Sequence, residues 1–128
     1  MIEWIGRVTA GRGLGSLRMT PDVLDLLRSE TGLHAVPGTL NVRLGGPVDE
    51  SLLPRYLGAS AIDPAWAEAT GQSGYRWVPV TIEGRFDGVA IRAVEDDYPD
   101  DLIEVVSGTH LRSELGLGDG DEIRLTVG

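Results

Sequence analysis

Short segments in which apolar and polar residues alternate, most of them bounded by glycine, recur along the chain. Alternation with a period of two places one face of a strand in a core, and glycine supplies the turn conformations that join strands. The segments with this pattern are residues 2–10, 39–44, 75–82, 89–94, 102–106 and 122–127. Five or six such strands predict a small, mostly β (α+β) barrel with short helices inserted between the strands.

Two inserted helices are expected from their end signals. Thr20 can cap the first, Pro21 suits its first turn, and Gly32 ends it. The second is expected in "HLRSELG", residues 110–116, and a single helical turn is expected before Pro54. Residues 58–74 show no regular pattern and are expected to form a surface excursion.

Size and composition indicate one domain, residues 1–128, of a soluble protein. The mean hydropathy is −0.03, and no apolar run approaches the roughly 20 residues that cross a bilayer. The start lacks the pattern of a secretory signal, so a cytoplasmic protein without a membrane partner is expected. The absence of cysteine excludes disulfides, thiolate metal sites and a cysteine nucleophile.

All 11 basic residues are arginine, and the chain contains no lysine. This excludes a Schiff-base lysine and the phosphate loop that depends on one. The net charge of −9 repels nucleic acid, so no nucleic-acid partner is expected. An acidic surface can also reflect high intracellular salt or a codon bias that favours arginine over lysine, and composition does not choose between these.

The stretch "PGTLN" places two neutral oxygen donors beside a turn. Thr39 and Asn41 are two residues apart on an expected strand, so their side chains point the same way. Mg²⁺ prefers oxygen ligands and often keeps substrate phosphates around it, so two neutral protein ligands can suffice. A plain Pro-Gly turn followed by a strand is the structural alternative.

The stretch "AGRGLGS" has glycines at positions 11, 13 and 15. Such a loop can expose successive N–H groups to phosphates, or it can be a plain hairpin turn. The spacing is not that of a dinucleotide-binding loop, because Ser16 occupies the position of the last glycine.

Two further segments carry polar groups that could serve a site. Glu104 interrupts the apolar strand "LIEVV" on the face of Leu102 and Val106, where it lies either in a site as a base or at an exposed strand edge. Arg112 lies in the second helix, where it could contact a phosphate or pair with a surface acid. His110 is expected to be a surface or capping residue.

Read in order, "GRVTAGRGLGS", "PGTLNVRL", "DYPDDLIEVV" and "HLRSELGLGDGDEIRL" resemble the archaeal-type, CTP-dependent riboflavin kinase family. They leave out chiefly residues 48–74. The resemblance implies a six-stranded, cradle-loop-type barrel. It also implies Mg²⁺-dependent transfer of the γ-phosphate of CTP to the 5′-hydroxyl group of riboflavin, which gives FMN and CDP.

The resemblance also implies a role for individual positions. Nucleotide-binding positions fall on Arg12, Gly13, Leu14, Gly15, Ser16, Leu17, Thr109, His110, Leu111 and Arg112. The metal ligands fall on Thr39 and Asn41. The flavin-binding positions fall on Asp97 and Glu104, and Asp97 stands where the family usually has threonine. We expect Glu104 to be catalytic, orienting and deprotonating the flavin hydroxyl group.

Two other classes of protein stay open. One is a non-catalytic module that binds nucleotide or flavin, in which Asp97 marks lost chemistry. The other is a barrel similar to the AbrB-type DNA-binding proteins, suggested by the ending "GLGDGDEIRL", although the acidic charge opposes it. With CTP and riboflavin as small-molecule substrates, we expect a monomer.

Overall fold

The computed structural model describes residues 2–9, 21–36, 39–58, 64–70, 74–94 and 98–127. Its strands are β1 (Ile2–Thr9), β2 (Leu40–Arg43), β3 (Arg55–Gly58), β4 (Gly74–Ile82), β5 (Phe86–Ala93), β6 (Leu102–Ser107) and β7 (Glu122–Val127). Its helices are α1 (Pro21–Thr31), α3 (Pro64–Thr70) and α4 (Leu111–Leu115), with a 3₁₀ turn η1 (Glu50–Leu52).

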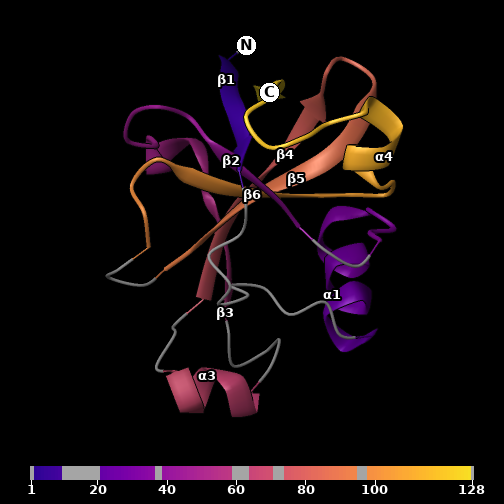
Figure 1. The fold of residues 1–128 in the computed structure, drawn as a ribbon. Coiled ribbons are helices and arrows are strands. Elements are labelled where there is room, and N and C mark those ends of the chain that lie inside the picture. The colour runs from indigo at the N-terminus through magenta and orange to yellow at the C-terminus, as the bar shows by residue number, and fades with distance from the viewer. Residues whose placement is uncertain are drawn as a thin grey trace.

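Six of these strands close into an antiparallel barrel. They follow the order β4-β5-β6-β2-β1-β7, and the pairing of β4 with β7 closes the ring. The two ends of the described chain lie side by side, because Ile2 pairs with Val127 (Figure 1). The predicted six-stranded barrel with short inserted helices is thus confirmed, and β3 is added outside the ring on β4.

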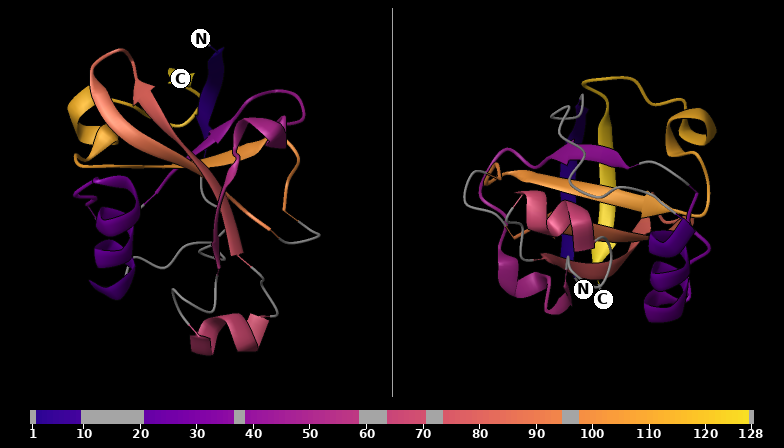
Figure 2. Two further views of the ribbon diagram at one scale, coloured as in Figure 1. Left: turned by 180° about the vertical axis from the view of Figure 1, so that it is seen from behind. Right: turned by 90° about the horizontal axis from the view of Figure 1, so that it is seen from below.

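The alternation along the strands produces two separate cores. Side chains that point into the barrel form the first, such as Val42, Ile103 and Leu125. Side chains that point outward from β4, β5 and β6 form the second with Leu27 of α1, which lies against the side of the barrel (Figure 2). Strands in the middle of this arrangement are therefore covered on both faces.

Several local signals for turns and helix ends agree with the structure, whereas Thr20, the predicted cap of α1, lies outside the described residues. Helix α1 ends before Gly32, which has φ of +76°. The hairpin between β4 and β5 turns through Glu83 and Gly84, both with positive φ. Gly88 of β5 allows a close approach, because an added Cβ would lie 2.7 Å from the carbonyl oxygen of Val106. None of the helices in the described ranges is long and apolar enough to span a bilayer.

The expectation of an irregular segment over residues 58–74 is wrong in part, because α3 lies within it. Strand β3, just after Pro54, was not predicted either. It has four residues, of which Leu57 alone is buried, so its own alternation is too short to detect. Contacts with β4 hold this strand in position instead. It pairs with β4, and the guanidinium of Arg55 lies over the ring of Trp77, 4.9 Å from the ring centre.

Candidate functional site

A row of polar residues crosses three neighbouring strands on the outer face of the barrel. Thr9 of β1 is paired with Asn41 of β2, and Asn41 is paired with Glu104 of β6. Residues paired across antiparallel strands point to the same face, so the structure brings Asn41 and Glu104 together. Thr39 lies two residues before Asn41 and points to that face as well, as predicted.

Glu104 is a buried carboxylate with two hydroxyl partners. Its side chain is on the face of Leu102 and Val106, as expected, and its exposed fraction is 4%. Thr39 donates its hydroxyl hydrogen to Oε1 at 3.2 Å, and Tyr98 donates to Oε2 at 2.8 Å. The alternative of an exposed strand edge is wrong, because β6 pairs with β5 on one side and β2 on the other.

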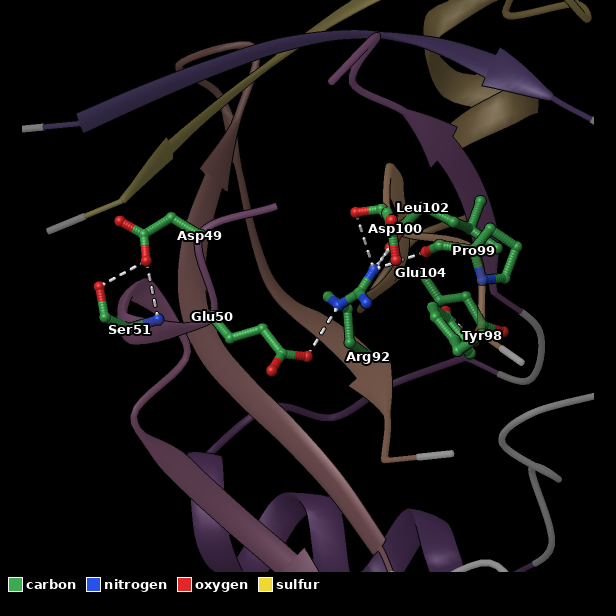
Figure 3. A network of polar contacts seen from close by, with 9 residues as sticks. All are labelled: Asp49, Glu50, Ser51, Arg92, Tyr98, Pro99, Asp100, Leu102 and Glu104. Atoms are coloured by element: carbon green, nitrogen blue, oxygen red, sulfur yellow. Dashed lines mark hydrogen bonds and ion pairs between the residues drawn. The ribbon is translucent and has the colours of Figure 1, made fainter. Parts of the chain in front are cut away.

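Arg92 of β5 is also buried, with an exposed fraction of 6%. Its Nη1 donates to the carbonyl oxygens of Pro99 at 2.8 Å and Leu102 at 2.6 Å, and its Nε lies 3.4 Å from Oε1 of Glu50. The guanidinium also lies over the ring of Tyr98, 4.8 Å from its centre (Figure 3). It therefore fixes the turn that carries Tyr98.

Sequence reasoning found neither Arg92 nor Tyr98. Tyr98 lies in the acidic stretch "EDDYPDD", which is typical of an exposed loop, yet its exposed fraction is 4%. Two weak signals were present: an arginine inside the otherwise apolar segment "VAIRAV", and an aromatic residue among five acids. Neither signal indicates which residues cover the side chain of Arg92 or Tyr98.

A cleft of about 160 Å³ opens beside Thr39. It is lined by Thr39 and Leu40 at the start of β2, by Val105 and Ser107 of β6, and by the segment from Thr109 to Ser113. Thus Thr39 and all four predicted nucleotide-binding positions after β6 face one cavity. Strand pairing between β2 and β6 explains why these distant segments meet.

The four residues from Thr109 to Arg112 present different groups to this cleft. Leu111 also packs in the barrel core, and so anchors α4 to the barrel. His110 is the N-cap residue of α4 and is exposed, as expected of a surface or capping histidine. Arg112 pairs with Asp119 at 2.8 Å, which is the surface pairing that the sequence left open, while it still lines the cleft.

The donors on this face fit a hard cation that also binds phosphate. The hydroxyl group of Thr39 donates its hydrogen to Glu104, so its oxygen lone pairs stay available to a cation. Within the described ranges, no group of three or more histidine, aspartate or glutamate residues could hold a metal ion. A cation held by Thr39 and Asn41 would therefore need further oxygens from phosphate and water.

Two sets of predicted positions lie outside the described residues. They are the glycine-rich segment Arg12, Gly13, Leu14, Gly15, Ser16 and Leu17, and the flavin-side position Asp97. The described site therefore consists of the row on β1, β2 and β6, the Arg92–Tyr98 contacts, and the cleft beside α4.

The described residues define a small closed β-barrel protein with a small cleft, neutral oxygen donors and a buried carboxylate. The family model named CTP-dep_RFKase, described as "Domain of unknown function DUF120", matches residues 8–127. The chain belongs to this family, in agreement with the resemblance read from its motifs.

The chain is similar to several proteins named riboflavin kinase. It is 34% identical over 123 residues to that of Methanocella arvoryzae and 32% identical over 130 residues to that of Methanococcoides burtonii. These matches cover 95% and 98% of this chain, but the chain spans just over half of each relative, 55% and 57%. The riboflavin kinase of Aeropyrum pernix is 31% identical over 124 residues, which are 95% of this chain and 92% of that protein.

Proposed function

We propose that this protein is a riboflavin kinase that transfers the γ-phosphate of CTP to the 5′-hydroxyl group of riboflavin, giving FMN and CDP. The observation that carries the proposal is the hydrogen bond between Thr39 and Glu104 beside the cleft. This hydrogen bond joins Thr39, which would hold the metal ion beside the phosphates, to the carboxylate of Glu104, which can accept a proton from an alcohol. Membership of the family and the names of the relatives support the same activity.

The nucleotide would lie along the cleft beside α4. Thr109, His110, Leu111 and Arg112 line it, and the glycine-rich segment from Arg12 to Leu17 would complete the site. Phosphoryl transfer needs positioning and charge neutralisation more than covalent help, so a site without lysine is chemically sufficient. Arg112 is the cationic side chain that lines this cleft.

Thr39 and Asn41 would hold Mg²⁺ together with the phosphates of CTP. When bound, the ion would neutralise charge on the transferred phosphoryl group. The fit depends on the orientation of the Thr39 hydroxyl group, which Glu104 fixes by accepting its hydrogen. Asn41 lies opposite Glu104 and adds a carboxamide oxygen to the same face.

Glu104 would orient the 5′-hydroxyl group of riboflavin and accept its proton. A bond forms between the hydroxyl oxygen and the γ-phosphorus while the bond from that phosphorus to the β–γ bridging oxygen breaks. CDP leaves with that oxygen, and the proton passes from the hydroxyl group to the Glu104 carboxylate and then to water. Asp97, on the flavin side, would accept a hydrogen bond from the substrate.

The test is to incubate the protein with riboflavin, Mg²⁺ and one of CTP, ATP, GTP or UTP, and to separate the flavins by chromatography. We expect FMN, formed fastest with CTP. Tight binding of nucleotide or riboflavin without FMN would instead favour a non-catalytic binding module. FMN formed equally well with every nucleotide would refute the choice of CTP but not the kinase activity.

A further inference from the structure

Two residues with buried charged groups in the described part of the chain, Arg92 and Glu104, are joined through the side chain of Tyr98. The guanidinium of Arg92 lies over the ring of Tyr98, and the hydroxyl group of that ring donates to Glu104 (Figure 3). A cation over the face of a phenol is attracted to the ring, and it polarises the O–H bond in the direction that strengthens donation. The contact therefore favours the hydrogen bond to the carboxylate.

Arg92 also fixes the backbone next to Tyr98 by hydrogen bonds. It donates to the carbonyl oxygens of Pro99 and Leu102, one on each side of the turn that leads into β6. Hydrogen bonds from a charged donor to buried carbonyl oxygens are strong, and the planar guanidinium makes several in a fixed geometry. Tyr98 is thereby fixed both through its ring and through its backbone.

These contacts fix the orientation of the Glu104 carboxylate. Its two oxygens accept from different hydroxyl groups, Thr39 on one side and Tyr98 on the other. Rotation of the carboxylate would break both hydrogen bonds at a buried site. A carboxylate fixed before substrate arrives does not have to be ordered during the reaction, which lowers the barrier.

We propose that Tyr98 and Arg92 are positioning residues, which hold the Glu104 carboxylate in the orientation that the acceptor hydroxyl group requires. The inference rests on the proposed kinase function. It assigns no contact between either residue and substrate, since both would act through Glu104.

The main variant is Tyr98→Phe, which keeps the ring under Arg92 and removes the hydroxyl group. We expect kcat for FMN formation to fall about tenfold or more, because a hydrogen bond to a charged group is lost. The KM for CTP is expected to stay within about twofold, since the nucleotide cleft is unchanged. Tyr56→Phe, at an exposed tyrosine of β3, is the matched control and is expected to leave kcat unchanged.

A double variant tests whether Tyr98 acts through Glu104. In the Glu104→Gln background, adding Tyr98→Phe is expected to change kcat by less than about twofold, because the group that it positions is already altered. A merely structural role would lower the thermal midpoint without this loss of additivity. Riboflavin affinity, measured by quenching of flavin fluorescence, gives a readout independent of turnover and is expected to fall in Tyr98→Phe.

Arg92→Lys provides the second line of evidence. It keeps the positive charge but loses the planar group that reaches two carbonyl oxygens, so kcat is expected to fall in the same direction. Arg85→Lys is the control, because Arg85 is an exposed arginine that also lies over a ring, that of Phe86. If Tyr98→Phe does not fold, Arg92→Lys decides by the same criteria.

Wild-type kcat in Tyr98→Phe, or a full additional loss on top of Glu104→Gln, would overturn the positioning role while the wild-type protein still forms FMN. A wild-type protein that forms no FMN with any nucleotide would overturn the proposed function, and the positioning role with it. The two failures are therefore distinguished by the wild-type reaction alone.

Discussion

The buried carboxylate of Glu104 offers the most informative single substitution, Glu104→Gln. The change keeps the shape of the side chain and its ability to accept a hydrogen bond but removes the negative charge and the proton-accepting oxygen. General acid–base catalysis contributes about 100-fold to 10,000-fold to a rate. We therefore expect kcat to fall at least about 100-fold, while the KM for CTP changes by less than about threefold.

The effect on folding is expected to be much smaller than the effect on turnover. One of the two hydroxyl groups, of Thr39 or Tyr98, would keep an uncharged oxygen acceptor, and the other would face the new NH2 group, from which it must accept, at roughly 1 kcal/mol each. The lower cost of burying an amide in place of a carboxylate offsets part of this loss. A net change of about 1 kcal/mol leaves a domain of ordinary stability folded.

The assay measures initial rates of FMN formation while riboflavin and CTP are varied separately. Glu30→Gln, at an exposed glutamate in the last turn of α1, is the matched control and is expected to behave as wild type. Turnover of Glu104→Gln within about twofold of wild type would remove Glu104 from the mechanism. A large rise in the KM for CTP with unchanged kcat would place Glu104 in nucleotide binding instead.

Three further substitutions test the metal site, the packing and the electrostatics. Thr39→Val is expected to raise the Mg²⁺ concentration for half-maximal CTP binding, measured by calorimetry, by about tenfold or more. Thr39→Ser is expected to stay near wild type, and an equal Mg²⁺ requirement in the two variants would contradict a metal-ligand role. Gly88→Ala is expected to lower the free energy of unfolding by about 1–3 kcal/mol in urea titrations, because the new Cβ would lie 2.6 Å from a side chain and 2.7 Å from a carbonyl oxygen. In the control, Gly46→Ala, the new Cβ meets no atom within 4 Å, and equal stability of the two variants would refute the packing argument. The side-chain and backbone hydrogen bonds from Ser51 lower the pKa of Asp49, so the ionised group stabilises the fold above its unfolded pKa and loses this effect as the pH falls through the lower folded value. Asp49→Asn is thus expected to lower the Tm at pH 7 and to approach wild type as the pH falls below the folded pKa, and a difference independent of pH would contradict this.

The elements that local physics determines could be predicted from the sequence. Pro21 and Gly32 mark the ends of α1, and alternation marks the longer strands. The same alternation predicted that Thr39 and Asn41 point to one face and that Glu104 shares the face of Leu102. These properties depend on neighbours within a few residues.

The remaining features depend on which strands become neighbours. Whether β6 is an edge strand is decided by the sheet order. Its two neighbours in the sheet come from other parts of the chain, since Ile103 pairs with Val42 of β2 and Glu104 pairs with Ile91 of β5. The burial of Tyr98 depends on Arg92 reaching across to its turn. No local pattern encodes such partners, so the acidic stretch around Tyr98 gives no sign that this tyrosine is buried.

Transfer of the γ-phosphoryl group from CTP to riboflavin can be followed by ³¹P NMR of one reaction mixture. With protein, riboflavin, CTP and Mg²⁺ present, we expect a phosphomonoester signal of FMN that grows in equal amount with the signals of CDP. Release of inorganic phosphate without FMN, or no change in the CTP signals, would show that this protein does not phosphorylate riboflavin.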